Sequence, residues 1–233
     1  MPARDNREQI HFAGRDVSIK WSRRRRSIGL TVSAEGRIII SAPLGASQSL
    51  LLQILTKNQA WIKRKVAERE ESWARLAPGA VFFGGQAYRL ILDPEAAVPV
   101  VLGDKEIRVK AATADAAWPL LEAWYRREAE EKIRERVNHY AREMGLAVPR
   151  VELRQWQRRW GECRPQEDLR FNWRLILLPP EMLDYVVVHE LTHLRAPGHA
   201  PRFWQEVGQV LPDYRQRRLW LNRYGTPFLL WGL

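Results

Sequence analysis

The stretch HELTHLRAPGH, from His189 to His199, constrains the fold more than any other feature of this 233-residue chain, because it holds three of the five histidines. His189 and His193 are four residues apart, a spacing that places both imidazoles on one face of an α-helix, about one turn apart. Apolar residues at helical spacing predict that this helix is buried: Leu183, Val186, Val187, Leu191 and Leu194. Buried histidines need partners, so the pattern indicates a metal site or, alternatively, hydrogen-bonded core histidines.

The residues around the two histidines favour the metal site. Pro179-Pro180-Glu181 is a typical helix start, and Pro197-Gly198 ends the helix and reverses the chain, so that His199 can return as a third ligand. Three protein ligands leave the fourth position of a tetrahedral Zn²⁺ ion to water, as in catalytic zinc sites. Glu190 follows the first ligand and can take a proton from that water. We therefore predict His189, His193 and His199 as zinc ligands and Glu190 as the general base of a hydrolase.

The chain is strongly basic, with 38 Lys and Arg against 27 Asp and Glu and a net charge of +11. Such a charge can attract nucleic acid, nucleotides or an anionic membrane surface. The one dense block is Arg23-Arg24-Arg25-Arg26, which is either a phosphate-binding patch or a solvated strand edge. No Gly-rich phosphate-binding loop is present, because Gly84-Gly85 lacks the G-x-x-x-x-G-K-[ST] pattern.

The location of the protein is predicted from its cysteine content and its apolar runs. Cys163 is the one cysteine, so no intramolecular disulfide can form, which suits a reducing cytoplasm. MPARDNREQI lacks the apolar core of a secretory signal, and no apolar run approaches the ~20 residues that cross a bilayer. We expect a cytoplasmic protein without a membrane partner.

The order of expected elements predicts an α+β fold. The first third alternates apolar and polar residues as β-strands do, with a hairpin turn at Ala34-Glu35-Gly36, and a helix is expected over residues 47–76. Two more hairpins follow, at Gly84-Gly85 and Gly103-Asp104. A helix over 114–145, short strands over 151–156 and 169–178, the histidine helix and one final helix from Pro201 complete the chain. We place the seam between a β-rich subdomain, residues 1–112, and a second subdomain, residues 113–233, and we find no repeat.

The stretch RRWGECRPQEDLRFNWRLILLPPEMLDYVVVHELTHLRAPGHAPRFW, residues 158–204, resembles the YgjP-like metallopeptidase family. More distantly it is similar to the SprT-like and WLM zincins, which share Arg-x-Gly-x-Cys, a strand, His-Glu-Leu-x-His and a later histidine. A weaker similarity extends to RRRRSIGLTVSAEGRIIISAP and KNQAWIKRK. The resemblance implies a β-rich N-terminal subdomain packed on a zincin-like metallopeptidase subdomain. It also implies His189, His193 and His199 as zinc ligands and Glu190 as general base.

Several other residues near this motif have alternative interpretations. Family members usually carry serine at the position of Glu162, whose charge lies either in the cleft or outside it. Cys163 is a small packing residue or an inhibitory zinc ligand. Tyr185 is a packing residue or stabilises an oxyanion. LRFNWRLILL is expected to be a strand that can align an extended peptide, with one polar face toward the cleft or toward solvent: Arg170, Asn172 and Arg174. Three tryptophans are expected in the core: Trp160, Trp173 and Trp204.

The sequence thus predicts a zinc-dependent hydrolase, and foremost a metallopeptidase acting on peptides or proteins. One alternative is a zinc-dependent nucleotide phosphohydrolase that uses arginines to bind its substrate. The other is a nucleic-acid-associated protein, either a SprT-like protease or a binding protein, that uses the basic surface. A pure binding module would not require Glu190 beside an open coordination position.

Overall fold

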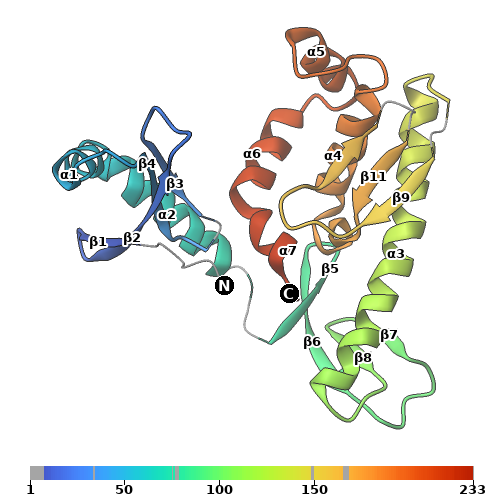
Figure 1. Ribbon diagram of the computed structural model, residues 1–233. Helices are drawn as coiled ribbons and strands as arrows, with labels where there is room; N and C mark the ends of the chain where they lie inside the picture. The colour runs from blue at the N-terminus through green and yellow to red at the C-terminus, as the bar shows by residue number, and fades with distance from the viewer. Residues whose placement is uncertain are drawn as a thin grey trace. The chain divides into compact units, whose positions relative to one another are not determined.

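The computed structural model describes residues 8–33, 35–74, 76, 79–147, 150–164 and 168–232. Ala34 of the first expected hairpin turn lies outside these residues. The chain forms two compact units, residues 1–75 and 76–233. The described ranges hold seven α-helices and three small sheets, which is a mixed α+β architecture (Figure 1). The seam expected between residues 112 and 113 falls inside the second unit, between strand β8 (Glu106–Val109) and helix α3 (Ala114–Glu143).

The first unit contains a four-stranded sheet and two helices. Its strands are β1 (Gln9–Phe12), β2 (Arg15–Ser22), β3 (Gly29–Val32) and β4 (Ile38–Pro43), in the order β1-β2-β4-β3. β2 and β4 are parallel, and the two outer pairs are antiparallel. Alternate residues of β4 are buried, as one face of a half-buried strand requires: Ile38, Ile40 and Ala42. Arg23–Arg26 are exposed in the connection between β2 and β3 rather than on a strand.

The helix expected over residues 47–76 is two helices, α1 (Gln48–Lys57) and α2 (Gln59–Ala74). The break is at Asn58, whose side-chain amide donates a hydrogen bond to the carbonyl oxygen of Ile54 at 2.8 Å. The Asn58 backbone N–H donates to Ile54 and Leu55 in addition. Asparagine competes in this way for carbonyls that an uninterrupted helix would use, and apolar periodicity alone does not reveal it.

The second unit opens with another four-stranded sheet: β5 (Ala80–Phe83), β6 (Gln86–Leu92), β7 (Val100–Leu102) and β8. Its order, β5-β6-β8-β7, and its strand directions repeat those of the first unit. The expected hairpins at Gly84-Gly85 and Gly103-Asp104 are both present. Gly84 and Gly85 have φ angles of 56° and 80°, which suit a two-residue hairpin turn. The same strand topology therefore occurs twice, although no repeat is found in the sequence.

The third sheet consists of β9 (Val151–Arg154), β10 (Gly161–Cys163) and β11 (Leu169–Asn172), in the order β10-β11-β9. The strand expected over 169–178 ends at Asn172, where the 3₁₀ helix η1 (Trp173–Leu177) begins. The cause is local, because the Asn172 side chain accepts a hydrogen bond from the Arg174 N–H and caps η1. The predicted polar face is wrong as a result: Asn172 and Arg174 are buried, and Arg170 pairs with Glu152 at 3.1 Å.

The helices of the second unit pack around α3 and α4 (Pro180–Thr192), and Figure 1 shows β9 beside α3. The fully buried apolar side chains of α3, α4 and α5 belong to one hydrophobic core: Ile133, Val137, Val187, Leu191 and Phe203. The single final helix expected from Pro201 is three helices, α5 (Pro201–Val210), α6 (Tyr214–Tyr224) and α7 (Thr226–Leu230). Pro212 lies between the first two, because proline interrupts helical hydrogen bonding. Gly225 lies between the last two, and Pro227 is in the first turn of α7, where proline is tolerated. No helix in the described ranges is long and apolar enough to span a bilayer.

Candidate metal centre

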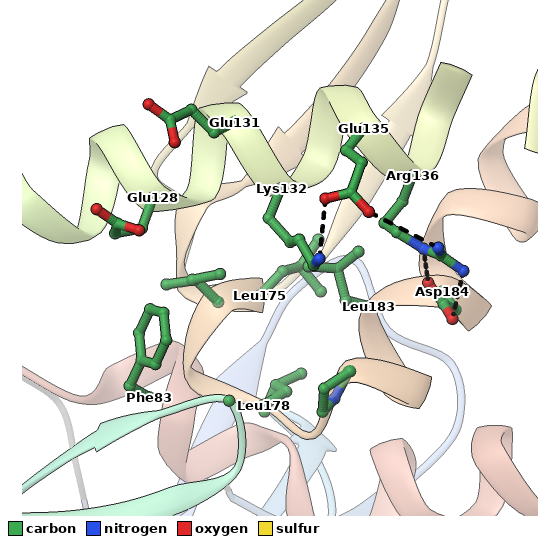
Figure 2. A pocket seen from close by; sticks show the side chains of 13 residues that line it. Phe83, Glu128, Glu131, Lys132, Glu135, Arg136, Leu175, Leu178, Leu183 and Asp184 are labelled. Carbon is green, nitrogen blue, oxygen red and sulfur yellow. Dashed lines mark hydrogen bonds and ion pairs between the residues drawn. The ribbon is translucent and has the colours of Figure 1, made fainter. Parts of the chain in front are cut away.

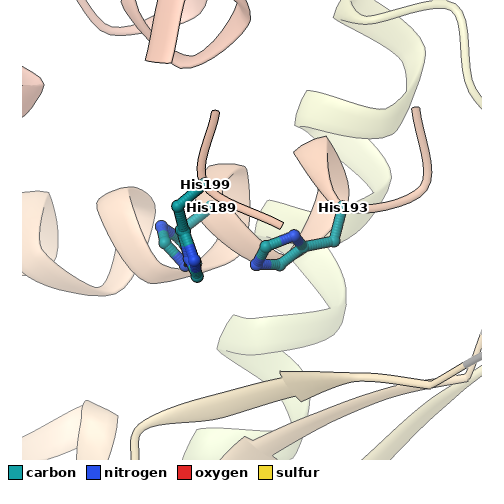
Figure 3. Close-up of side chains that lie close together, drawn as sticks. All are labelled: His189, His193 and His199. Atoms are coloured by element: carbon teal, nitrogen blue, oxygen red, sulfur yellow. The ribbon is translucent and has the colours of Figure 1, made fainter. Parts of the chain in front are cut away.

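The three histidines meet although they come from two segments. His189 lies in the last turn of α4, His193 directly follows that helix, and His199 lies in the loop before α5. The loop turns back through Gly198, which has a φ of 80°. The Nε2 atoms of His189 and His199 are 3.1 Å apart, and one ring nitrogen from each histidine lies within 4.8 Å of the others. Figure 3 shows the three rings pointing toward one another.

This arrangement fits a single metal ion. Two nitrogens bound to one tetrahedral zinc at 2.0–2.1 Å are about 3.3 Å apart, close to the 3.1 Å between the Nε2 atoms of His189 and His199. Burial lowers the pKa of His189 to about 3 and also lowers the pKa of His193, so both rings are neutral at pH 7, the form that binds metals. The His193 ring donates a hydrogen bond to the Ala196 carbonyl, which leaves its other nitrogen free to act as a ligand.

Glu190 lies beside the cluster with its side chain buried against β10. The Cys163 backbone N–H donates a hydrogen bond to the Glu190 carboxylate, yet burial prevails and raises the pKa of Glu190 to about 8. A Cβ atom on Gly161 would lie 2.6 Å from Oε1 of Glu190 and 2.7 Å from its Cγ. Any side chain at position 161 would therefore displace the carboxylate, which gives the glycine of the WGEC stretch a physical role that sequence reasoning did not find.

The same strand has one edge without a partner strand. In the register of β10 with β11, the Asn172 N–H donates to Trp160 and the Arg164 N–H donates to Asp168. Hydrogen-bonded pairs alternate with non-bonded pairs along an antiparallel ladder, so the backbone groups of Gly161 and Cys163 point away from β11. The bond from Cys163 to Glu190 agrees with this direction. Within the described ranges, no strand covers this edge.

The strand expected to align a peptide is therefore not the one with a free edge. β11 lies between β9 and β10, so both of its edges are occupied. Asn172 nevertheless supports the site, because its side-chain amide donates to the carbonyls of Trp156 and Arg159 at 2.8 and 3.2 Å. These bonds hold the loop that leads into β10.

His189, His199 and Glu190 line a cleft of about 490 Å³ that also exposes side chains from α5 and α6. Its lining is Trp160, Gly161, Tyr185, Val186, His189, Glu190, His199, Trp204, Arg218, Leu221 and Asn222. Trp160 and Trp204 are half-buried here rather than in the core, whereas Trp173 is fully buried as expected. The Trp204 Nε1–H donates to the His199 carbonyl at 3.1 Å, and the two rings stack.

Sequence reasoning missed Trp204 and Arg218 as cleft residues. Trp204 follows the histidine motif by five residues, but it also fits the apolar stripe of α5, so its position carried no distinct signal. Arg218 lies outside every motif, and nothing in the sequence separates it from the other arginines of this basic chain. Arg218 belongs to α6, and only the three-dimensional structure shows that this helix lines the same cleft as His189 and His199.

The residues with alternative interpretations now have defined places. Glu162 pairs with Arg159 at 2.5 Å, so its charge is balanced locally, and its side chain does not line the cleft. Among the described His, Cys, Asp and Glu side chains, the group that could hold a metal ion comprises only the three histidines, so Cys163 is outside it. Tyr185 is buried, and its ring centroid is 5.9 Å from that of His189 at the wall of the cleft.

A second cavity, of about 550 Å³, lies at the other end of α4, between α3, η1 and the β5–β6 turn (Figure 2). Its cations are already paired with carboxylates that line it: Lys132 with Glu135 at 2.9 Å, and Arg136 with Asp184 at 2.6 Å. Phe83, Leu178 and Leu183 provide apolar surface. This cavity holds none of the three histidines, and its Arg136–Asp184 ion pair connects α3 to α4.

Two comparisons with known proteins bear on the site. A family model described as YgjP-like, metallopeptidase domain, matches residues 26–224. The match spans most of both units and includes the three histidines and Glu190. No curated protein shows a significant match to the chain.

Proposed function

Because the chain belongs to the YgjP-like metallopeptidase family, we propose that it is a zinc-dependent peptidase with its active site at the three-histidine cluster. His189, His193 and His199 bind the metal, and Glu190 is the general base. The observation that carries the proposal is the position of Glu190: a buried carboxyl group, packed against Gly161 and Cys163 of β10, in the same cleft as His189 and His199.

The roles of the chain's own groups follow from that geometry. Zinc supplies Lewis acidity, which acidifies a coordinated water and polarises the carbonyl of the bond to be cleaved. A metal cation bound by the histidines would lower the raised pKa of the Glu190 carboxyl and keep it ionised. Glu190 then accepts the proton of the water whose oxygen attacks the carbonyl carbon, and delivers it to the amine nitrogen as the C–N bond breaks. The edge of β10 that faces away from β11 aligns the substrate, since the outward backbone groups of Gly161 can pair with an extended peptide, while the Cys163 N–H holds Glu190.

Metal analysis tests the metal site directly. The purified protein is expected to contain about one zinc ion per chain, and His189→Ala should remove it, because two remaining imidazoles hold zinc poorly. His139→Ala is the matched control, since His139 is half-exposed on α3 and pairs with Glu143 outside the cluster. Zinc content that is unchanged in His189→Ala would contradict the proposed ligand set.

Peptide hydrolysis tests the general base. Glu190→Gln should keep zinc and lose at least about 100-fold in kcat, the usual effect of removing a general base. Glu162→Gln is the control for a nearby carboxylate outside the cleft and should remain within about twofold of wild type. A casein-like protein and a mixed peptide pool are suitable substrates, and full activity of Glu190→Gln would exclude Glu190 as base.

A second candidate, a zinc-dependent nucleotide phosphohydrolase, is favoured by one observation. Arg218 lines the metal cleft, and an arginine beside a catalytic metal suits a phosphate as well as a carboxylate. A parallel screen of nucleoside triphosphates separates the two candidates. Hydrolysis of triphosphates that depends on Glu190, with no cleavage of peptides, would replace the peptidase assignment.

A further inference from the structure

Arg218 occupies the boundary between the metal cleft and a neighbouring depression of about 780 Å³ on α5 and α6. The two share Trp204, Arg218 and Asn222 in their linings. A substrate that passes the histidines along this surface therefore meets Arg218 next. The depression continues past Arg215 and Leu219, the latter 70% exposed.

The guanidinium of Arg218 is held in place by an aromatic stack. Its Cζ atom lies 4.3 Å from the centre of the Trp204 ring, a cation–π contact. Trp204 stacks on Tyr214 with ring centroids 5.6 Å apart and donates its Nε1–H to the carbonyl of His199. Arg218 is thus tied, through one tryptophan, to the loop residue His199, so its distance from the metal site is restricted.

The positive charge of Arg218 is not balanced by a neighbour. Within the described residues, no carboxylate forms an ion pair with Arg218, whereas the adjacent Arg217 pairs with Asp213 at 2.9 Å. Glu190 is the one carboxylate among the lining residues of the two depressions. With a divalent metal bound, the cleft would hold three positive charges against one negative, which favours an anionic ligand.

We propose that Arg218 is a specificity-determining residue that binds an anionic group of the substrate next to the bond that is cleaved. Its planar guanidinium matches the oxygens of a carboxylate or a phosphate. In a peptide the group is the side chain of Asp or Glu, and in a nucleotide it is a phosphate. The inference rests on the proposed function for hydrolysis at the metal centre, but it does not depend on which bond is hydrolysed.

Matched peptides test the proposal with the zinc-loaded, full-length protein. Peptides that differ only by Asp or Asn, or by Glu or Gln, at each position flanking the scissile bond are compared by kcat/KM. At one position, wild type should prefer the acid by about fivefold, the upper end of what an exposed charge pair contributes. Arg218→Gln should abolish that preference by raising KM for the acidic peptide, with the neutral peptide unchanged.

A charge-reversal variant of Arg218 and a control variant at another arginine make the test of substrate preference more specific. Arg218→Glu should favour Lys over Asp at the same position, a change that a merely structural defect would not produce. Arg202→Gln is the control, because Arg202 is exposed on α5, pairs with Glu206 at 3.2 Å and lines neither depression. Its substrate preference should equal that of wild type, and zinc content and thermal midpoint are measured for each variant.

The outcomes separate this proposal from the peptidase assignment. If triphosphates are hydrolysed instead of peptides, the peptidase assignment fails, and the role of Arg218 holds if Arg218→Gln raises KM for the triphosphate about tenfold. Equal losses on acidic and neutral peptides would overturn the proposal and indicate that Arg218 acts on the reacting carbonyl or on folding. A wild-type protein without any preference for the acidic peptide, or cleavage lost only when the peptide's terminal carboxylate is amidated, would overturn it as well.

Discussion

The two four-stranded sheets of this protein have the same strand order and a two-residue turn between their first two strands, and the second of these turns packs against the segment that leads into the helix carrying His189. In the first sheet the turn is Ala13-Gly14, and in the second it is Gly84-Gly85; all four residues have positive φ. A Cβ atom at Gly14 would meet nothing within 4 Å. The same atom at Gly85 would lie 2.7 to 2.8 Å from Pro179.

This difference shows that topology does not create the site. In the second turn, the backbone N–H groups of Gly84 and Gly85 donate hydrogen bonds to the carbonyl oxygens of Ile176 and Leu177 in η1, at 2.8 and 3.0 Å. Pro179 directly precedes α4, so the contact between Gly85 and Pro179 supports the first turn of the helix that carries His189. Two sheets with the same strand order thus have different structural roles, because the turn of the second sheet contacts Pro179 and η1.

The largest effect is expected for Gly85→Ala. The new Cβ would meet backbone atoms of Pro179, and alanine is also strained at a φ of 80°, so the unfolding free energy should fall by about 3 kcal/mol. Urea unfolding measures the loss. Because the start of α4 must shift, zinc should also dissociate more readily in a chelator competition. A loss below about 1 kcal/mol would mean that the turn is not a support for α4.

Gly161→Ala tests the other end of the same helix and should affect activity more than folding. Here the Cβ would meet the end of the Glu190 side chain, which can rotate away but then leaves its position beside the metal ligands. We expect about 100-fold lower kcat, equivalent to about 2.7 kcal/mol, with zinc retained. Gly45→Ala, where the added atom would meet nothing within 4 Å, is the control. Activity within twofold of wild type would show that the Glu190 position seen here is not needed.

The smallest effect is expected for Gly84→Ala, which gives the second turn the Ala-Gly sequence of the first. The added Cβ would meet nothing within 4 Å, so the cost is limited to the positive φ, about 1 kcal/mol. Gly14→Ala should cost about the same in the first unit and leave zinc affinity unchanged. If Gly84→Ala proved as damaging as Gly85→Ala, backbone strain rather than contact with Pro179 would explain both.

Local sequence patterns determined much of this protein. Apolar periodicity and Pro179-Pro180 identify α4, glycine-containing turns identify the hairpins, and four-residue spacing singles out His189 and His193. Each of these signals depends on neighbours a few residues apart. Glu190 and His199 belong to the same local pattern, and their roles stay predictions. Local competition explains the errors too, since Asn58 and Asn172 end elements whose apolar patterns continue.

Only the tertiary structure decided which residues from separate helices and strands line the same cleft. The free edge of β10 depends on which strand β11 pairs with, and the fit of Glu190 against Gly161 joins residues 29 positions apart. Arg218 comes from still farther along the chain, and the turn of the second sheet reaches α4 across almost a hundred residues. Such contacts arise from packing between elements, which leaves no periodic trace in a single sequence. The sequence determined the chemistry that we propose, and the fold decided where a substrate can lie.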